Sequence, residues 1–410
     1  MSDSTEPSRS ALKSRNFRIF LCGNAISVIG LWVQRLAFGW QAWQLSESPL
    51  VVGLIAAAQF IPLLLLTPFF GVFVDRIKRR NGAIVMHVIM MIISSLLAAL
   101  TLQGAITIEW LLGLALIHGI AYSAYSPIRL SLIPDLVARS QFPSAVAINS
   151  IVFNASRFIG PGIAGGIIAL YGIGFAYVVN TVTYLPVIVA LLFIEPVKAA
   201  RAPSGETGFL DQLLEGVRYS RNHPSIRQVI LLAGASTFFG RGIIEIFPAL
   251  VVLIFDGDSA VLAAMMASAG AGAIGASVMF SLLRSHQHLP MMVLIGAIGI
   301  GTSMFLLANV SRIEYGLAVT SLLGFFATMV SIGSQSEMQI KVDDELRGRV
   351  MSLWTLAIIG GPAIGSIVAG ALASELGSTY TLLLFAITSL LLTALVALRR
   401  ASGGNTTNQD

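Results

Sequence analysis

The sequence predicts an all-α membrane protein, with twelve transmembrane helices arranged in two pseudo-symmetric six-helix bundles. Three observations predict this architecture. Of the 410 residues, 56% are hydrophobic and 11% are charged, whereas soluble domains carry roughly 25% charged residues. Apolar runs of membrane-spanning length recur along the chain, and basic residues gather at alternate ends of these runs.

The apolar runs define the expected helices. Each can cross a hydrocarbon layer of about 30 Å, which takes about 20 helical residues. Helices are required because lipid offers no hydrogen-bonding partner to free backbone groups. The predicted helices cover residues 17–45, 50–74, 82–104, 108–130, 142–170, 173–194, 226–254, 258–283, 290–308, 312–340, 348–374 and 378–399.

A polar interval separates the two halves. Within it, Phe209, Leu213 and Val217 recur at helical spacing, which favours a short amphipathic helix on the membrane surface. A plain solvated linker is the alternative. The predicted domains are an N-terminal bundle at 1–194, a cytoplasmic linker at 195–225, a C-terminal bundle at 226–400 and a disordered tail at 401–410.

Lys and Arg follow a topological pattern. They crowd the N-terminus, the loop after the second helix and the polar interval, whereas the opposite side has Arg312 among acidic residues. The positive-inside rule therefore places both termini in the cytoplasm, as expected of a multi-pass protein of a bacterial plasma (inner) membrane. The net charge of +5 reflects this topology, so we expect no nucleic-acid partner. We also expect the protein to be a monomer embedded in lipid.

Several chemistries are not expected. Cys22 is the only cysteine and the five histidines lack metal-ligand spacing, so we expect no metal and no cofactor. His118 is interpreted as a packed helical histidine. The sequence has no Gly-x-x-x-x-Gly-Lys-Ser/Thr loop, which argues against ATP-driven pumping. We therefore predict that the protein is not an enzyme.

A carboxylate and four cations arrive together where the second apolar run ends, between Gly71 and Arg80. Gly71 would allow two helices to approach closely. Asp75 is expected to face the N-terminus of the helix that starts near Arg349, where the helix dipole favours an anion. Arg79 can pair with Asp75. The alternative is ordinary positive-inside charge.

A second motif lies in the fifth predicted helix: Ser156, Gly160, Pro161 and Gly165. Small residues permit tight helix packing, and Pro161 removes one backbone hydrogen bond and bends the helix. Gly-Pro recurs at 361–362, which indicates weakly related halves. A plain packing motif is the alternative reading.

Four charged residues interrupt predicted helices: Arg35, Arg157, Arg241 and Glu245. A charge at the middle of the bilayer costs at least about 2.5 kcal/mol, so each should face a cavity or a partner. Arg241 and Glu245 can pair at i and i+4. Glu245 is the only carboxylate that we place well inside a helix, which makes it the best proton-carrier candidate; a structural ion pair is the alternative.

Polar and aromatic side chains also interrupt the apolar runs. We expect them to line a substrate cavity between the halves. The candidates are Gln34, Trp40, Gln41, Tyr122 and Asn154.

The stretch from Gly71 to Arg80 resembles the loop signature of the major facilitator superfamily, with Lys78 standing where glycine is usual. In that family the cluster latches the cytoplasmic side shut. The resemblance implies this role for Gly71, Asp75, Arg76 and Arg79.

The fifth helix is similar to the antiporter signature of the superfamily's exporters, with Ala164 in place of one glycine. Segments at 16–20, 48–53, 125–135 and 346–352 resemble the branch that contains the bacterial enterobactin exporter. The resemblance implies the major facilitator fold and antiport.

These patterns favour a secondary active transporter. We expect proton-coupled export of a small amphipathic molecule, siderophore-like or drug-like, by alternating access around a site between the halves. A lysophospholipid flippase of the same superfamily is the alternative. A transporter-like sensor would need a signalling domain, which the sequence does not indicate.

Overall fold

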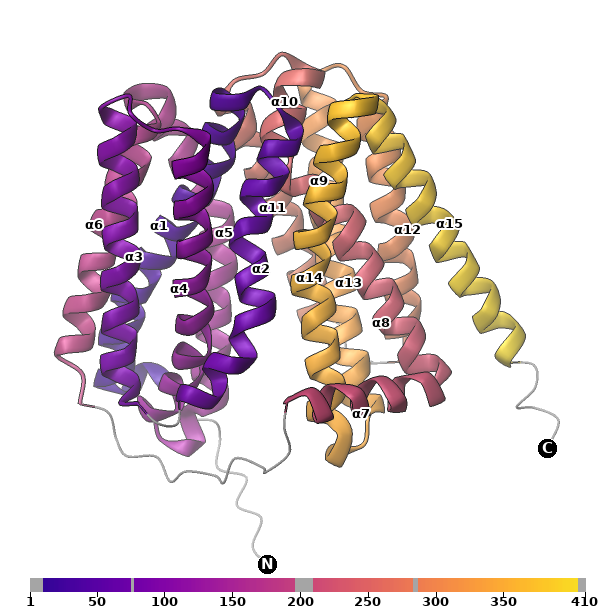
Figure 1. The fold of residues 1–410 in the computed structure, drawn as a ribbon. Coiled ribbons are helices and arrows are strands. Elements are labelled where there is room, and N and C mark those ends of the chain that lie inside the picture. The colour runs from indigo at the N-terminus through magenta and orange to yellow at the C-terminus, as the bar shows by residue number, and fades with distance from the viewer. Residues whose placement is uncertain (1–9, 75–76, 196–208, 283–286, 405–410) are drawn as a thin grey trace, which may run out of the picture. The chain divides into compact units, whose positions relative to one another are not determined.

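The structure is a computed structural model that describes residues 10–74, 77–195, 209–282 and 287–404. Nearly all of these residues are helical, and no strand occurs in the described ranges (Figure 1). The predicted all-α architecture is therefore confirmed.

Contacts between Cα atoms divide the chain into two compact units. Unit 1 comprises Met1–Gln41 and Pro62–Gly205, and unit 2 comprises Ala42–Ile61 and Glu206–Asp410. The segment Ala42–Ile61 belongs to unit 2 because it packs on a later helix of that unit. Ser366 Oγ, for example, donates a hydrogen bond of 3.1 Å to the Gly53 carbonyl.

Unit 1 is built on long helices that follow one another along the chain. Within it, α3 packs against both α4 and α6, and the three lie side by side in Figure 1. Close packing is possible where α1 meets α6, because a Cβ at Gly30 would overlap Thr183 and Asn180. The helices that contribute to unit 1 are η1 Ala11–Lys13, α1 Arg15–Ser46, α2 Pro49–Val74, α3 Arg79–Leu102, α4 Ile108–Asp135, η2 Arg139–Gln141, α5 Phe142–Tyr171 and α6 Ile173–Leu192.

Unit 2 repeats this plan with more interruptions. Its helices α11 and α12 both pack on α13, and α12 also packs on α15. Its elements are α7 Phe209–Asn222, α8 Pro224–Ser236, the π-helix η3 Thr237–Arg241, α9 Gly242–Glu245, α10 Phe247–Phe255, α11 Ser259–Leu282, α12 Leu289–Ala308, α13 Ile313–Lys341, α14 Asp344–Leu376 and α15 Ser378–Gly404.

In the described part of the chain, eleven helices are long and apolar enough to span a membrane. A bent pair, Pro224–Glu245 with Phe247–Phe255, supplies one more if it is counted as one span. This pair corrects the prediction of one continuous helix at 226–254: the two parts meet at 63°. Pro248 stands at the start of α10, where it has no N–H with which to continue the preceding helix.

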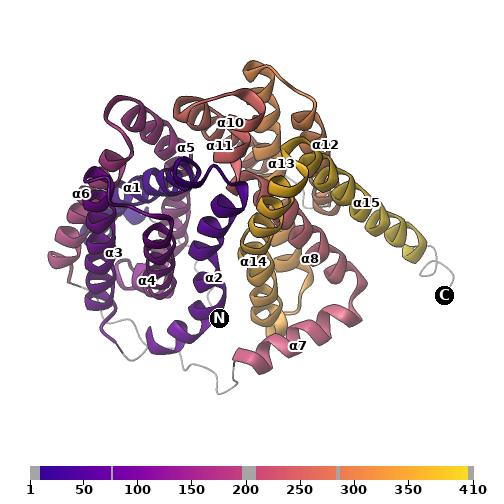
Figure 2. The same cartoon turned by 45° about the horizontal axis from the view of Figure 1, so that its top comes forward.

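The linker contains the expected helix, α7. It lies crosswise to α8 and α14 at one end of unit 2 (Figures 1 and 2). Glu215 forms an ion pair with Arg349 of α14. Tyr219 Oη donates to Asp343 Oδ2 over 3.3 Å, and desolvation together with the Asp343 carboxylate raises the pKa of Tyr219. These contacts fix α7 to the start of α14.

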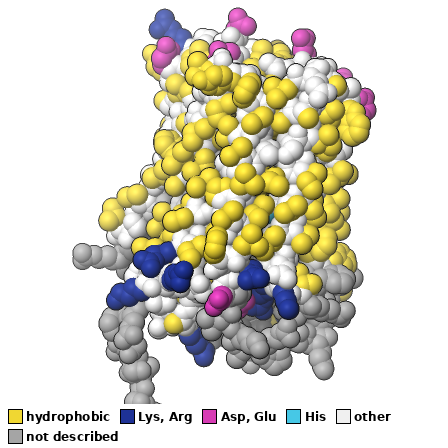
Figure 3. Space-filling view, turned by 90° about the vertical axis from the view of Figure 1, so that its left-hand side faces the viewer, with side chains coloured by type: hydrophobic (Ala, Val, Ile, Leu, Met, Phe, Trp, Pro, Cys, Tyr) yellow, Lys and Arg dark blue, Asp and Glu magenta, His cyan; other side chains and the backbone are white. Residues whose placement is uncertain are grey.

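The side of unit 1 has the surface of a membrane protein. Hydrophobic side chains cover its middle, Lys and Arg gather toward one end, and Asp and Glu are prominent at the other (Figure 3). An apolar belt between two polar ends is what a hydrocarbon layer requires of a protein surface.

Candidate functional site

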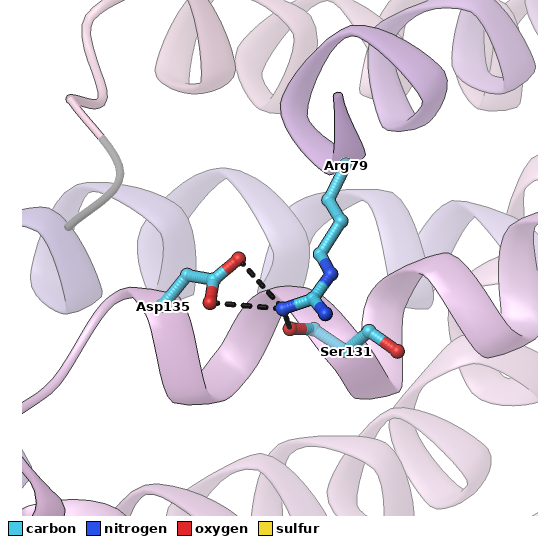
Figure 4. A network of polar contacts seen from close by, with 3 residues as sticks. All are labelled: Arg79, Ser131 and Asp135. Atoms are coloured by element: carbon cyan, nitrogen blue, oxygen red, sulfur yellow. Dashed lines mark hydrogen bonds and ion pairs between the residues drawn. The ribbon is translucent and has the colours of Figure 1, made fainter. Parts of the chain in front are cut away.

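Two helix ends of unit 1 are joined by an ion pair. Arg79, the first residue of α3, places Nη1 2.9 Å from Asp135 Oδ1 and 3.0 Å from Oδ2, at the end of α4 (Figure 4). The same nitrogen donates to the Ser131 carbonyl over 3.0 Å. The Asp135 side chain is 11% exposed, so the pair is substantially desolvated and holds α3 to α4.

The other latch candidates are less informative. Asp75 and Arg76 lie outside the described residues, as does the predicted pairing of Asp75 with Arg79. A Cβ added at Gly71 would have no described atom within 4 Å, so unit 1 supplies no steric reason for glycine there. Arg80 donates from Nη1 to the Ile194 carbonyl over 3.0 Å, which ties the start of α3 to the end of α6.

An apolar cavity of about 460 Å³ adjoins the latch region, between α2, α3 and α4 of unit 1. Val74, Ile77 and Val85 contribute to its wall, and Lys78 and Asn81 are its polar members. Its lining suits a hydrocarbon chain better than a charged solute.

The motif in α5 packs against α1. Ser156, Gly160, Pro161 and Gly165 are all buried. A Cβ at Gly160 would overlap Cβ of Trp32, so only glycine permits this approach. Ser156 Oγ donates to the Val152 carbonyl of its own helix over 2.8 Å.

Gln34 and Gln41, two of the cavity candidates, are bound inside unit 1. Asn180 Nδ2 and Ser94 Oγ donate to Gln34 Oε1 over 2.6 and 2.7 Å. Tyr177 Oη donates to Gln41 Oε1 over 2.7 Å. These bonds join α1 to α3 and α6, so they give both glutamines a packing role, and cavity lining by them stays a prediction.

The remaining cavity candidates differ from one another. Trp40 is buried. Asn154 is exposed and donates to the Ser150 carbonyl of its own helix over 2.9 Å. Tyr122 is half-buried and borders a small cavity of about 20 Å³, together with Tyr125 and Arg129. His118 is buried near Tyr184 Oη at 3.5 Å, as expected of a packed histidine.

Arg35 and Arg157 meet at an aromatic ring. The Cζ atoms of Arg35 and Arg157 lie 5.2 and 5.8 Å from the centre of the Trp32 ring. Trp32 in turn makes an edge contact with Phe153 at 5.8 Å between centres, and Arg129 Cζ lies 5.7 Å from the Phe153 ring. The structure thus joins the two predicted arginines and adds Arg129, which the sequence analysis did not single out.

In unit 2, Arg241 and Glu245 lie on the broken span. Arg241 ends the π-helix η3, and Glu245 ends α9, immediately before the bend. Both side chains are half-buried. π-helical turns are frequent at functional sites, so the π-helix beside the break supports Glu245 as a candidate functional residue.

The broken span is pressed against α14. A Cβ at Gly365 would overlap the Phe238 carbonyl, and one at Gly242 would lie 2.7 Å from the Gly365 carbonyl carbon. Thr237 Oγ1 lies 3.0 Å from the Ala357 carbonyl. The Gly-Pro segment of α14 therefore packs on the π-helix, as that of α5 packs on α1.

The sequence analysis missed a buried carboxylate, Glu337, in the last turns of α13. Its side chain is 2% exposed, its Oε1 lies 2.7 Å from Lys341 Nζ, and its Oε2 has no partner among the described residues. Glu245 is therefore not the only carboxylate inside a helix. The weak repeat between the halves could have identified it. When the halves are aligned on their Gly-Pro segments, Asp135 falls within one residue of Glu337.

Comparison with known proteins decides the family. Residues 7–408 match the model of the transporter family MFS_3, described as transmembrane secretion effector. The chain belongs to this family. The result confirms the superfamily prediction and the expectation that the protein is not an enzyme.

Curated relatives of this transporter match most of its length. A staphyloferrin A transporter of Staphylococcus aureus is 21% identical over 379 residues, covering 92% of this chain and 94% of its own. An enterobactin exporter of Shigella boydii is 26% identical over 403 residues, covering 94% and 92%. The multidrug efflux pump Tap of Mycolicibacterium fortuitum is 26% identical over 390 residues, covering 90% of each.

Solved structures agree on the fold of this transporter. The nucleoside transporter NupG superimposes with a TM-score of 0.75 at 14% identity, covering 94% of this chain and 98% of that one. A bacterial homologue of the lysosomal transporter Spinster gives a TM-score of 0.73 at 14% identity, covering 96% and 97%. Identities this low carry the fold alone.

Proposed function

We propose that this transporter is a proton-coupled exporter of a small amphipathic molecule, siderophore-like or drug-like, and that it works by alternating access. The observation that carries the proposal is the position of Glu245 at the break of the bent span. Discontinuous helices commonly form the substrate and coupling-ion sites of secondary transporters.

Glu245 lies within the bent span and not at its outer end. Ten positions separate it from Phe255 at the end of α10, which is at most about 15 Å of helix, and the 63° bend makes the depth from that end smaller. Arg241 lies four residues earlier on the same span, so both charged side chains lie on the part of the span that ends at the bend.

The direction and location of transport draw on other features. Curated relatives are named as exporters of enterobactin and as a multidrug efflux pump, and α5 carries the antiporter-like motif. We place the protein in a bacterial plasma membrane as a monomer with both termini in the cytoplasm, in line with its basic loops. The ion pair between Arg79 and Asp135 would hold α3 and α4 together next to the latch region.

A transport screen in vesicles tests the proposal. The purified protein is reconstituted, and enterobactin, staphyloferrin A and fluorescent dyes are offered while pH and sodium gradients are varied independently. We expect a pH gradient to drive uptake of at least one probe, and Glu245→Gln to abolish the gradient-driven part. Glu375→Gln, an exposed carboxylate near the end of α14, is the matched control and should transport normally.

Two outcomes would overturn the proposal. Gradient-driven transport by Glu245→Gln at the unmodified rate would remove the proton role of this residue. Transport of a labelled lysolipid without dependence on either gradient would favour the flippase alternative.

A further inference from the structure

The small cavity beside Tyr122 lies between α1, α3, α4 and α6 of unit 1 and has a largely polar wall. Its volume is about 20 Å³, which is enough for one water molecule. It can therefore take one small polar group of a ligand, but not a whole organic molecule. Among the described residues that line it, Arg129 carries the one permanent charge, and none is a carboxylate.

This cavity opens on the side of Arg129. Its members on α3 and α6 include His87 and Tyr184, which are 1% and 2% exposed. The half-buried members are Leu31 of α1 and Tyr122 and Arg129 of α4. A group that enters from outside unit 1 therefore passes between α1 and α4 and meets the Arg129 side chain.

Arg129 makes no ion pair in the part of the chain that the structure describes. The next carboxylate along α4, that of Asp135, accepts from Arg79 with both oxygens, over 2.9 and 3.0 Å. Arg129 lies six positions before Asp135, which is about 9 Å of helix, so its charge lies inside the span. A charge inside a span is costly, and it is found where it serves a partner or a ligand pathway.

One donor of Arg129 needs an acceptor. Its Nε is buried and has no hydrogen-bond partner among the described residues, and a buried donor without an acceptor is destabilising. Two neighbouring donors of the wall are satisfied within unit 1. Tyr125 Oη donates to Asn24 Oδ1 over 3.4 Å, and His87 Nδ1 donates over 2.8 Å to the Ala83 carbonyl, which can only accept. The wall is thus preformed, and Arg129 supplies the donor that an entering group would satisfy.

We propose that this cavity binds the carboxylate of an amphipathic organic anion, with Arg129 as its partner and the body of the molecule outside the mouth between α1 and α4. Arg129 Cζ lies 5.7 Å from the centre of the Phe153 ring, which holds the guanidinium at the mouth. The planar fork of a guanidinium matches a carboxylate, and the small volume favours a planar carboxylate over a bulkier phosphate or sulfonate. This inference rests on the proposed export function and names the chemical class of one end of its cargo.

Equilibrium binding of three dansyl probes tests the inference. Dansyl-β-alanine, its amide and dansyltaurine share one aromatic body and one spacer, and they end in a carboxylate, a neutral amide and a sulfonate. Binding is measured by equilibrium dialysis with the full chain in phosphatidylcholine nanodiscs, with empty nanodiscs as the blank and without any ion gradient. We expect dansyl-β-alanine to bind about tenfold or more tightly than its amide, because a hydrogen bond to a charged group is worth at least this factor. It should also bind several-fold more tightly than dansyltaurine.

The variants separate Arg129 from general charge effects. Arg129→Gln should weaken the binding of dansyl-β-alanine about tenfold, to the level of the amide, because the charged partner is gone. Binding of the amide itself should stay unchanged, which a merely structural role of Arg129 would not produce. Arg139→Gln changes an exposed arginine of η2, just beyond the end of α4. It is the matched control and should bind all three probes like the unmodified chain.

Size-exclusion chromatography checks that each variant is folded. If Arg129→Gln aggregates, Arg129→Lys takes its place; it keeps the charge, loses the planar fork and should bind dansyl-β-alanine several-fold less tightly. Equal binding of the carboxylate and the amide, or an unchanged preference in a folded Arg129 variant, would overturn the inference. Sulfonate binding as tight as that of the carboxylate would overturn the assignment of a carboxylate. Carboxylate binding without pH-driven transport would instead sustain the inference and refute the proposed proton coupling.

Discussion

At the residue scale, several charged side chains of this transporter contact partners on other helices. Sequence spacing suggested that Arg79 pairs with Asp75, four residues away. That pairing lies outside the described residues. The contact that the structure describes joins Arg79 to Asp135, a residue on a different helix, and no local spacing rule could identify it. Trp32 and Arg35, three residues apart on α1, could be read as neighbours, but Arg157 on α5 could not.

The Arg79–Asp135 pair can be tested by a double-mutant cycle. Arg79→Gln leaves the Asp135 carboxylate, 11% exposed, without its principal cation, so we expect a loss of about 3 kcal/mol. In Arg79→Gln/Asp135→Asn the buried charge is gone, and part of the loss should be recovered. Thermal unfolding in detergent measures the stability of the two single variants and of the double variant. Strictly additive losses would show that the pair is not coupled.

At the element scale, the helices were predictable and their irregularities were not. Hydrophobic run length located the spanning segments to within a few residues, because lipid imposes both length and apolarity. The break after Glu245 depends on Pro248 together with the close approach of α14 at Gly365. Proline alone did not predict it, since Pro161 and Pro362 lie inside continuous helices.

The contact between α5 and α1 gives a prediction with an internal control. Gly160→Ala should destabilise the protein by about 1–3 kcal/mol, because the added methyl group would overlap Trp32 and overpack the helix interface. Gly162→Ala, on the same helix, meets nothing within 4 Å and should be neutral or stabilising, by up to about 1 kcal/mol. Gly160→Ala should therefore lower the unfolding temperature while Gly162→Ala leaves it unchanged or raises it, and equal losses would contradict the packing argument.

At the scale of the whole molecule, composition and basic-residue asymmetry were sufficient to predict the fold, and motifs were sufficient to predict the family. The contacts of the candidate site residues could be identified only from the structure. Gln34 and Gln41 are predicted cavity residues, and the structure adds that they bond to α3 and α6 inside unit 1. Glu337 was not singled out from the sequence, yet it is buried.

Topology can be measured with the single native cysteine removed. In a Cys22→Ser background, Lys13→Cys and Glu109→Cys place thiols at opposite ends of unit 1, both at exposed positions. A membrane-impermeant maleimide added to intact cells should label Glu109→Cys, and it should label Lys13→Cys only after lysis, since the positive-inside rule puts the N-terminus in the cytoplasm. The reverse pattern would invert the proposed orientation.

The central claim is that export is coupled to protons through Glu245. The most direct measurement is proton flux in sealed vesicles loaded with a pH-sensitive dye. A transported probe is added on one side, and no pH gradient is imposed. The account predicts that movement of the probe drives proton counterflow, and that Glu245→Gln carries the probe downhill without any counterflow. Counterflow that persists in Glu245→Gln, or is absent from the unmodified protein while the probe moves, would contradict it.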